Sequence, residues 1–314
     1  MRFKPAASLR METVMNDFYE KLDGLYASGD LNSVEDFLKN AVAEEGSSAP
    51  IRASLLNELA GFYRGVSRYS ESEAAFEQAL AIFESIGMGA TPEYATVLMN
   101  LAGLYRMRGE ADKAIELFFG AMKKLEDFGA RDTYAYVSVL NNLALAYQSK
   151  SDYQNAVEYA SKALSLMRAG SGSEHEIATS LNNLASIYLG LADLEKAGSH
   201  ISESLAIYDS MEEPDVHHAA ALTTKAVLMH RLGDHQGSLN GFRRALDLTN
   251  RFFGENMEYA ICKRNISEVC ELLGDVDSAI QELSDAARVM AKLLGPDHVS
   301  VIAANKKLEE LQKL

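Results

Sequence analysis

The sequence predicts an all-α solenoid, a curved stack of helical hairpins, and three observations support this fold class. A motif with Leu, Ala, Tyr and neighbouring Asn residues recurs, and in its fullest copy, Leu140–Tyr147, it reads Leu-Asn-Asn-Leu-Ala-Leu-Ala-Tyr. A small residue recurs every 41 or 42 positions in the second helix of each unit. Gly-Asp or Gly-Glu pairs separate the two helices of several units. A period near 42 that contains two helices is typical of a helical-hairpin solenoid.

The recurring motif explains how neighbouring helices pack. Further copies begin at Met99 and Leu181, and a looser copy begins at Asn57. Each copy places Leu, Ala and Tyr at helical spacing, so one face of the helix can pack against a neighbour. The Ala is small where two helices must approach closely. Asn is a poor helix former, so its repetition at one position of the motif indicates a use other than folding.

The elements are predicted in order as one continuous domain with a cap at each end. An N-terminal capping hairpin covers residues 12–50, and a C-terminal capping helix covers 300–314. Such caps cover the stacking face that an end repeat would otherwise expose. Between them lie six repeats, at about 51–90, 91–132, 133–174, 175–214, 215–256 and 257–299. Their second helices carry the small residues Ala79, Ala121, Ala163, Ser204, Ala245 and Ala286.

The turns within the hairpins have their own signature. Four of them pair Gly with an acidic residue: Gly29-Asp30, Gly109-Glu110, Gly233-Asp234 and Gly274-Asp275. Gly can take the left-handed conformation that ends the first helix, and the acidic residue can cap the second. Two units keep the Asp and lose the Gly, at Ser151-Asp152 and Ala192-Asp193, and the first unit has Ser67-Arg68. Short linkers with Gly or Pro, such as 170–173, separate the units without forming a domain break.

Composition restricts the classes of protein. Of the 314 residues, 47% are hydrophobic, there is no Trp, and only 5 are Pro, which suits long helices. The net charge of −15, without a basic block, argues against binding nucleic acid or an anionic membrane. No apolar run approaches about 18 residues, so no transmembrane helix is predicted. Residues 1–8 are basic but lack an apolar core, so no signal peptide is predicted and a cytoplasmic location is expected.

The two cysteines are also consistent with a location in the cytoplasm. Cys262 and Cys270 are eight residues apart on one predicted helix, about 12 Å by helical rise, which is too far for a disulfide. We expect reduced, buried thiols. Cys270 occupies the Tyr position of its motif copy, so we expect it to be inert.

These features resemble tetratricopeptide repeats (TPRs), in the longer-period form found in kinesin light chains and their bacterial relatives. Asn-Asn-Leu-Ala-x-x-Tyr, followed by Gly-Asp or Gly-Glu, recurs in full or in part over about 51–294, and the linker Leu294–His298 is also characteristic. The resemblance implies a right-handed α-α superhelix whose first helices line the concave side. It also implies a non-enzymatic scaffold or adaptor that binds a peptide or a segment of a partner protein in its concave groove.

The resemblance also suggests which side chains face the groove. The Asn directly before each Leu should face the groove. The residue that precedes this Asn should lie at the edge of the groove, and the residue that follows each Tyr should point inward. Small residues such as Gly61 and Gly103 should leave room for a peptide. The Asn pair is complete only in the middle units, because unit five has Thr223-Thr224. The candidate groove residues are Asn100, Asn141, Asn142, Asn182, Asn183, Asn265, Arg64, Arg106, Gln148 and His230, with Asn57, Thr223 and Arg264 at the edge.

Charge provides an independent observation on this face. The six predicted first helices together carry +2, which leaves −17 for the rest of a chain whose total is −15. Carboxamides can pair with both donors and acceptors of a peptide backbone. Arg64 and Arg106 could then pair with an acidic side chain or a C-terminal carboxylate of the partner.

Several alternatives remain open from the sequence. The Asn residues could instead align the stack through hydrogen bonds to neighbouring helices or water. The chain could be a regulatory receptor for a short signalling peptide, as some bacterial TPR proteins are, or a structural protein that self-assembles through its end repeats. The partner, the oligomeric state and the choice between groove and outer face are not determined.

No catalytic, metal or cofactor site is predicted. His217-His218 follows Asp215, His175 lies between two Glu residues, and His298 follows Asp297. None shows the i, i+4 His pair or the Cys spacing of a dedicated metal site, so solvation at helix starts is the preferred interpretation. The glycine-rich and nucleophile motifs of common enzyme classes are absent, and we predict that the chain is not an enzyme.

Overall fold

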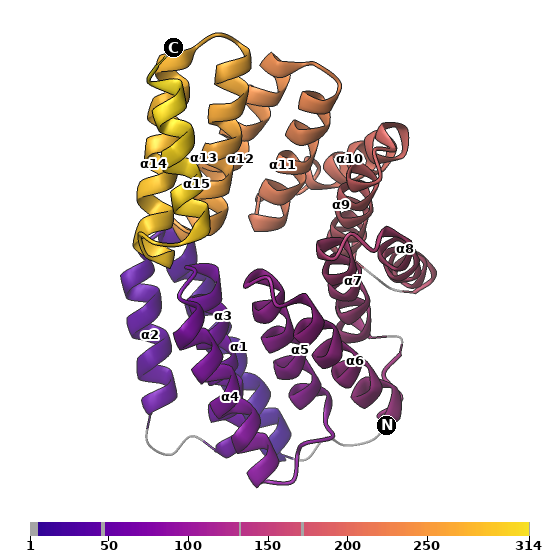
Figure 1. Ribbon diagram of the computed structural model, residues 1–314. Helices are drawn as coiled ribbons and strands as arrows, with labels where there is room; N and C mark the ends of the chain where they lie inside the picture. The colour runs from indigo at the N-terminus through magenta and orange to yellow at the C-terminus, as the bar shows by residue number, and fades with distance from the viewer. Residues whose placement is uncertain (1–5, 45–47, 132, 171–172, 314) are drawn as a thin grey trace.

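The structure is a computed structural model that describes residues 6–44, 48–131, 133–170 and 173–313, with side chains from residue 16 onward (Figure 1). This part of the chain holds fifteen α-helices and no strands, which confirms the all-α prediction. Consecutive helices pack as antiparallel pairs and the pairs stack along the chain, as a solenoid requires.

The helices follow the repeat pattern. The first two, α1 (Ala6–Ser28) and α2 (Leu31–Ala43), precede the repeats, and α15 (Val299–Leu311) follows them. The pairs between them are α3 (Ala49–Gly65) and α4 (Tyr69–Ser85), α5 (Pro92–Met107) and α6 (Ala111–Asp127), α7 (Tyr134–Ser149) and α8 (Tyr153–Ala169), α9 (Glu174–Gly190) and α10 (Leu194–Tyr208), α11 (Val216–Arg231) and α12 (His235–Phe253), and α13 (Met257–Leu272) and α14 (Val276–Leu294).

The predicted period is confirmed by where the helices begin. The first helices of successive pairs start 40 to 43 residues apart, from Ala49 in α3 to Met257 in α13. The small residue in the second helix of each pair is at most 1% exposed. Only a small side chain at this position lets the second helix approach its neighbours closely.

The turns within the pairs share one conformation even where Gly is missing. Gly29, Gly109, Gly233 and Gly274 have positive φ, as the sequence predicted. Ser67, Ser151 and Ala192 adopt the same left-handed conformation, with φ near 60°, at a steric cost that Gly avoids. The geometry of the hairpin therefore dictates the turn. The Asp that follows accepts backbone N–H bonds at the start of the second helix in five pairs, at Asp30, Asp152, Asp193, Asp234 and Asp275.

The first helices form the inner wall of the stack. From α3 to α11, each first helix contacts the first helix of the next pair. Figure 1 shows these helices arranged around an open centre, with α4, α6, α8 and α10 farther out. The concave side therefore consists of the helices that carry the Asn motif.

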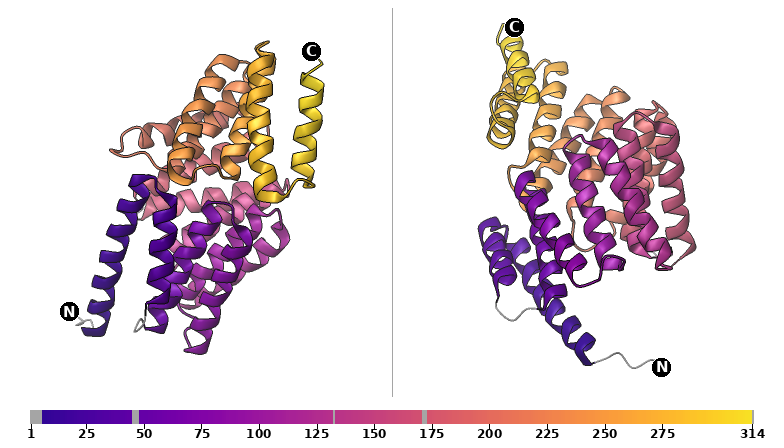
Figure 2. Two further views of the ribbon diagram at one scale, coloured as in Figure 1. Left: turned by 90° about the vertical axis from the view of Figure 1, so that its left-hand side faces the viewer. Right: turned by 60° about the horizontal axis from the view of Figure 1, so that its bottom comes forward.

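The superhelix curls until its first repeat contacts its last, which the sequence did not predict (Figures 1 and 2). The Nδ2 atom of Asn256, before α13, donates a hydrogen bond of 2.8 Å to the carbonyl oxygen of Gly65. The backbone N–H of Met257 donates to the Oγ atom of Ser67 at 3.0 Å. The Phe253 ring meets the Tyr26 ring edge to face, with 6.4 Å between centroids. We call this set of contacts the seam.

The remaining predictions concern the cysteines, membrane-spanning helices and the division of the chain into repeats. Both cysteines are free and buried, and burial raises the pKa of Cys262 to about 12, as expected for inert thiols. Every helix in the described ranges is too short or too polar to span a bilayer. Residues 1–5 of the predicted N-terminal segment and residues 171 and 172 of a predicted linker lie outside the described residues. The division into capping hairpin, six repeats and capping helix stays a prediction.

Candidate functional site: a cavity in the concave wall

A cavity of about 310 Å³ opens in the concave wall between the first helices of successive repeats. Five candidate groove residues line it: Arg106 from α5, the Asn141-Asn142 pair from α7 and the Asn182-Asn183 pair from α9. Two consecutive helical repeats therefore present their Asn pairs to one space. Four carboxamides and one guanidinium meet there.

The carboxamides are held by the helices that carry them. Asn141 donates from Nδ2 to the Oγ atom of Ser180 in the next repeat at 2.9 Å, and Asn142 donates to the carbonyl oxygen of Ser138 at 2.9 Å. Asn182 and Asn183 are each 8% exposed. The Oδ1 atoms of Asn141 and Asn182 have no hydrogen-bond partner among the described residues. Because buried polar atoms are normally paired, these carbonyl groups retain capacity to accept hydrogen bonds.

The cavity has further walls that sequence reasoning missed. Tyr134, His175 and Glu176 lie seven residues before Asn141, Asn182 and Asn183, respectively. Seven residues are two helical turns, so these side chains share a face with the Asn pairs. That spacing was the signal that could have identified them. Other lining residues are Val137, Ser138, Leu145, Thr179, His217 and Ala220.

Three candidate groove residues instead join neighbouring repeats. Arg64 donates from Nη1 to the carbonyl oxygen of Asn100 at 3.0 Å, and Asn100 donates from Nδ2 to the Oδ1 atom of Asn57 at 2.9 Å. Gln148 donates to both the carbonyl and the hydroxyl oxygen of Ser186. These bonds agree with the alternative that polar inner residues align the stack.

The two remaining candidates lie in another cavity. His230 and Asn265 line a space of about 190 Å³ between α11 and α13, where the Nε2 atom of His230 is 3.9 Å from Glu268. The ten candidates therefore separate into five at the main cavity, three between repeats and two at this smaller site.

The room expected beside Gly103 is not open to a peptide. A Cβ atom at this position would lie 3.0 Å from Nη1 of Arg64, so the Arg64 guanidinium occupies that space. Desolvation and, to a smaller extent, the nearby Arg106 charge lower the pKa of Arg64 to about 10, although Glu58 opposes the shift. Arg64 therefore forms part of the wall of the superhelix.

Arg106 lies where the cavity meets the seam. It also lines a cleft of about 860 Å³ between the turns of the first two repeats and α13 to α15. Desolvation lowers the pKa of Arg106, and Glu258 of α13 opposes this shift. The Nε atom has no hydrogen-bond partner among the described residues. Arg106 is therefore the guanidinium at the main cavity that can meet an anionic group.

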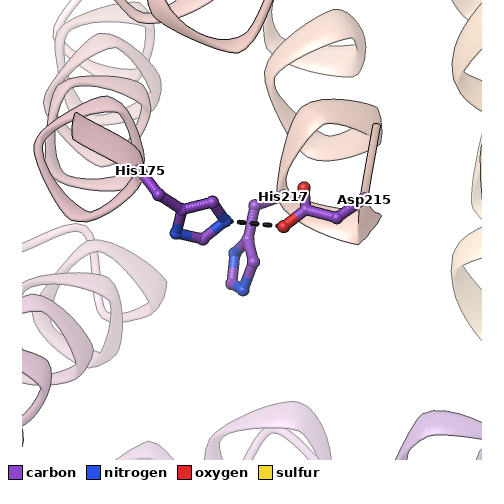
Figure 3. Close-up of side chains that lie close together, drawn as sticks. All are labelled: His175, Asp215 and His217. Carbon is purple, nitrogen blue, oxygen red and sulfur yellow. Dashed lines mark hydrogen bonds and ion pairs between the residues drawn. The ribbon is translucent and has the colours of Figure 1, made fainter. Parts of the chain in front are cut away.

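Three titratable side chains from two repeats meet at the rim of the cavity (Figure 3). The Nε2 atom of His175, in α9, lies 2.6 Å from the Oδ2 atom of Asp215, the N-cap of α11. His217 is the second residue of α11, and its ring centroid is 5.1 Å from that of His175. The sequence interpretation placed Asp215 and His217 at one helix start and His175 at another, whereas the structure brings all three together.

The surroundings of this cluster shift two of its pKa values. Burial favours the neutral form of Asp215, but hydrogen bonds from the His218 backbone and from His175 outweigh it and lower the pKa. His217 is exposed, yet it also lines the cavity. Desolvation therefore lowers the pKa of His217, and His175 adds to this shift while Asp215 opposes it.

Comparison with known families agrees with the repeat architecture. A family model described as "Tetratricopeptide repeat" matches residues 51–118, 136–210 and 217–292, more than half of the chain. The chain belongs to the tetratricopeptide repeat family. TPR repeats mediate interactions between proteins. No protein matched in the comparison with curated proteins.

Solved structures share the fold at low sequence identity. NprR, in complex with its cognate peptide NprX, has 14% identity and a TM-score of 0.64, over 95% of this chain and 88% of that chain. A Rap protein complexed with Competence and Sporulation Factor has 13% identity and a TM-score of 0.58, over 98% of both chains. BtubC (BKLC) from P. vanneervenii has 23% identity and a TM-score of 0.51, over 74% of this chain and 92% of that chain.

Proposed function

We propose that this protein is a non-enzymatic adaptor that holds an extended peptide, or a segment of a partner protein, in its concave groove. The observation that carries the proposal is the convergence of four Asn carboxamides and Arg106 on one cavity. A carboxamide offers both a donor and an acceptor, so two adjacent pairs match the alternating N–H and C=O groups of an extended backbone. Two residues that line the cavity, Tyr134 and His217, are exposed, so the cavity is accessible to solvent on the concave side.

The charge of the cavity lining suggests which group of the partner binds in the cavity. Arg106 contributes a positive charge to the cavity, where Glu176 is the only carboxylate among the described lining residues. A guanidinium pairs with a carboxylate through two parallel hydrogen bonds. We propose that Arg106 meets an acidic side chain or a C-terminal carboxylate of the partner. Arg64, expected to share this task, is already bonded to the Asn100 carbonyl oxygen.

A second candidate is a regulatory receptor for a short signalling peptide. The seam favours it, because contacts between the first and last repeats give the superhelix a closed form that a ligand could strengthen or release. NprR and Rap, which share the fold, were solved with a cognate peptide and with Competence and Sporulation Factor. A receptor must bind its peptide more tightly in one conformation than in the other.

Self-assembly is a third candidate, and it involves α15. Val299 and Ile302 are 72% and 57% exposed on this helix. A sizing measurement on full-length protein and on a chain that stops before Ser300 separates this candidate from the others. A monomeric full-length protein contradicts it.

The adaptor proposal is tested by selecting binders from a displayed peptide library with purified protein and measuring their affinities by fluorescence anisotropy. The variant Asn142→Ala/Asn183→Ala removes one carboxamide from each pair. Each lost hydrogen bond contributes about 1 kcal/mol, so we expect affinity to fall roughly 10- to 100-fold.

The matched control is Asn240→Ala, an exposed Asn on the outer helix α12. It should leave affinity unchanged, and thermal melts by circular dichroism should show all variants folded. Equal affinity of the double variant and the wild type for every selected peptide would contradict groove binding. Small-angle scattering with and without peptide then separates a receptor, whose pitch changes, from a passive adaptor.

A further inference from the structure

The His175, Asp215 and His217 cluster has the composition of a metal site. Two imidazole nitrogens and one carboxylate oxygen lie within 4.8 Å of one another. This ligand set suits Zn²⁺ and similar divalent transition metals, which bind His nitrogen and Asp oxygen at about 2.0–2.2 Å.

The His175 and Asp215 side chains need little movement to accept an ion, and the His217 nitrogen lies within 4.8 Å of both ligand atoms. Tetrahedral ligands at these bond lengths lie about 3.3 Å apart. The Nε2 atom of His175 and the Oδ2 atom of Asp215 are 2.6 Å apart, so they must separate by less than about 1 Å. Both side chains are about one-third exposed, which leaves them room for this adjustment. Figure 3 shows the His217 ring beside the pair.

Neighbouring groups orient the three side chains. Asp215 uses its other oxygen, Oδ1, to accept the backbone N–H of His218 at 2.9 Å, which turns Oδ2 toward His175. The His175 ring packs edge to face on Tyr208, with centroids 5.6 Å apart. The hydroxyl of Tyr208 in turn hydrogen-bonds to that of Thr179 at 2.8 Å. Such outer contacts are what hold metal ligands in a fixed orientation.

We propose that His175, Asp215 and His217 form a binding site for a divalent transition metal ion of the zinc type, which would link the fourth and fifth repeats. Three protein ligands leave a fourth position open, as in sites that exchange a ligand. His175 and His217 also line the Asn cavity. If the groove binds a peptide, as proposed above, a carboxylate or imidazole of that peptide could occupy the open position.

The test titrates Zn²⁺ alone into tag-free, chelator-treated protein by isothermal titration calorimetry. The variants are His175→Gln, Asp215→Asn and His217→Gln. Asn is as good an N-cap as Asp, so Asp215→Asn keeps the start of α11 while it removes the charged ligand. His200→Gln, on the outer helix α10, is the matched control.

We expect one equivalent of Zn²⁺ to bind, and each of the three variants to weaken binding by at least about tenfold. His200→Gln should bind like the wild type, and Mg²⁺ should not compete, because Mg²⁺ prefers oxygen ligands. Absence of stoichiometric binding, or affinity unchanged in the three variants, would show that the cluster is only a hydrogen bond between repeats. Because no peptide is present, this result does not depend on groove binding.

Discussion

The side-chain amide of Asn256 donates a hydrogen bond of 2.8 Å to the backbone carbonyl of Gly65, 191 residues earlier in the chain. The same side chain accepts the backbone N–H of Tyr259 at 2.9 Å and so caps α13. Asn256 is 3% exposed. One buried residue therefore caps the first helix of the last repeat and also joins it to the first repeat.

Substitution of Gly65 by Ala should open the seam. A Cβ atom at Gly65 would lie 2.6 Å from Cε1 of Phe253, so the ring or the backbone must move. We expect Gly65→Ala to increase the radius of gyration measured by small-angle scattering. Gly61→Ala, in the same helix α3, is the control because its Cβ would meet nothing within 4 Å. If both variants scatter like the wild type, the seam tolerates the added methyl group and does not set the curvature.

Substitution of Ala192 by Gly should stabilise the protein. Ala192 has φ 59° in the turn between α9 and α10, a conformation that costs a residue with a Cβ atom about 1–2 kcal/mol. Part of the gain is offset because Gly makes the unfolded chain more flexible, so we expect about 0.5–1 kcal/mol in urea unfolding. The reverse change, Gly233→Ala in the corresponding turn with φ 85°, should destabilise. Changes of the opposite sign would show that these turns relax away from the left-handed conformation.

Enlarging the small residue of a second helix should disturb the stack. Ala121, in α6, is fully buried, and a Leu there must force neighbouring side chains or helices apart. We expect Ala121→Leu to cost about 1–3 kcal/mol of unfolding free energy. Glu116→Leu, at an exposed position of the same helix, should change stability by no more than about 0.5 kcal/mol. Comparable melting temperatures for the two variants would contradict close packing at Ala121.

Stability should decline in alkaline solution because of buried tyrosines. Burial, together with hydrogen bonds to Glu84 and Glu126, raises the pKa of Tyr94 and Tyr136 from 10 to about 12. A folded pKa above the unfolded value means that their stabilisation is complete below pH 10 and is lost as pH rises toward 12. Melting temperatures of the wild type should therefore fall more steeply across this window than those of Tyr94→Phe/Tyr136→Phe. Parallel curves would show that these two hydroxyls do not contribute.

The repeat fold was predictable because its determinants are local. Ala163 and Asp152 lie within one hairpin, and periodic burial and capping act over single helices and turns. Even so, the left-handed turn at Ala192 was not predictable from residue type, because Ala avoids that conformation. There, packing of two long helices outweighs a small local cost.

The candidate site was predictable only in part. The Asn141-Asn142 and Asn182-Asn183 pairs were identified through their motif, and the structure brings them to one cavity. Arg64 and Gln148 share the same helix face but bond to neighbouring repeats. Position on a face does not reveal which side chain reaches across to the next helix, because that depends on side-chain length and on the offset between repeats.

By itself, the sequence determined the all-α class, the repeat family and the period of the hairpins. Only the tertiary structure decided that His175 meets Asp215 and that Asn256 reaches Gly65. The reason is physical. Helices and turns are specified by neighbouring residues, whereas the curvature of a solenoid is the sum of small rotations at each interface between repeats. No single motif encodes that sum, so contacts between distant repeats emerge only when the whole stack is assembled.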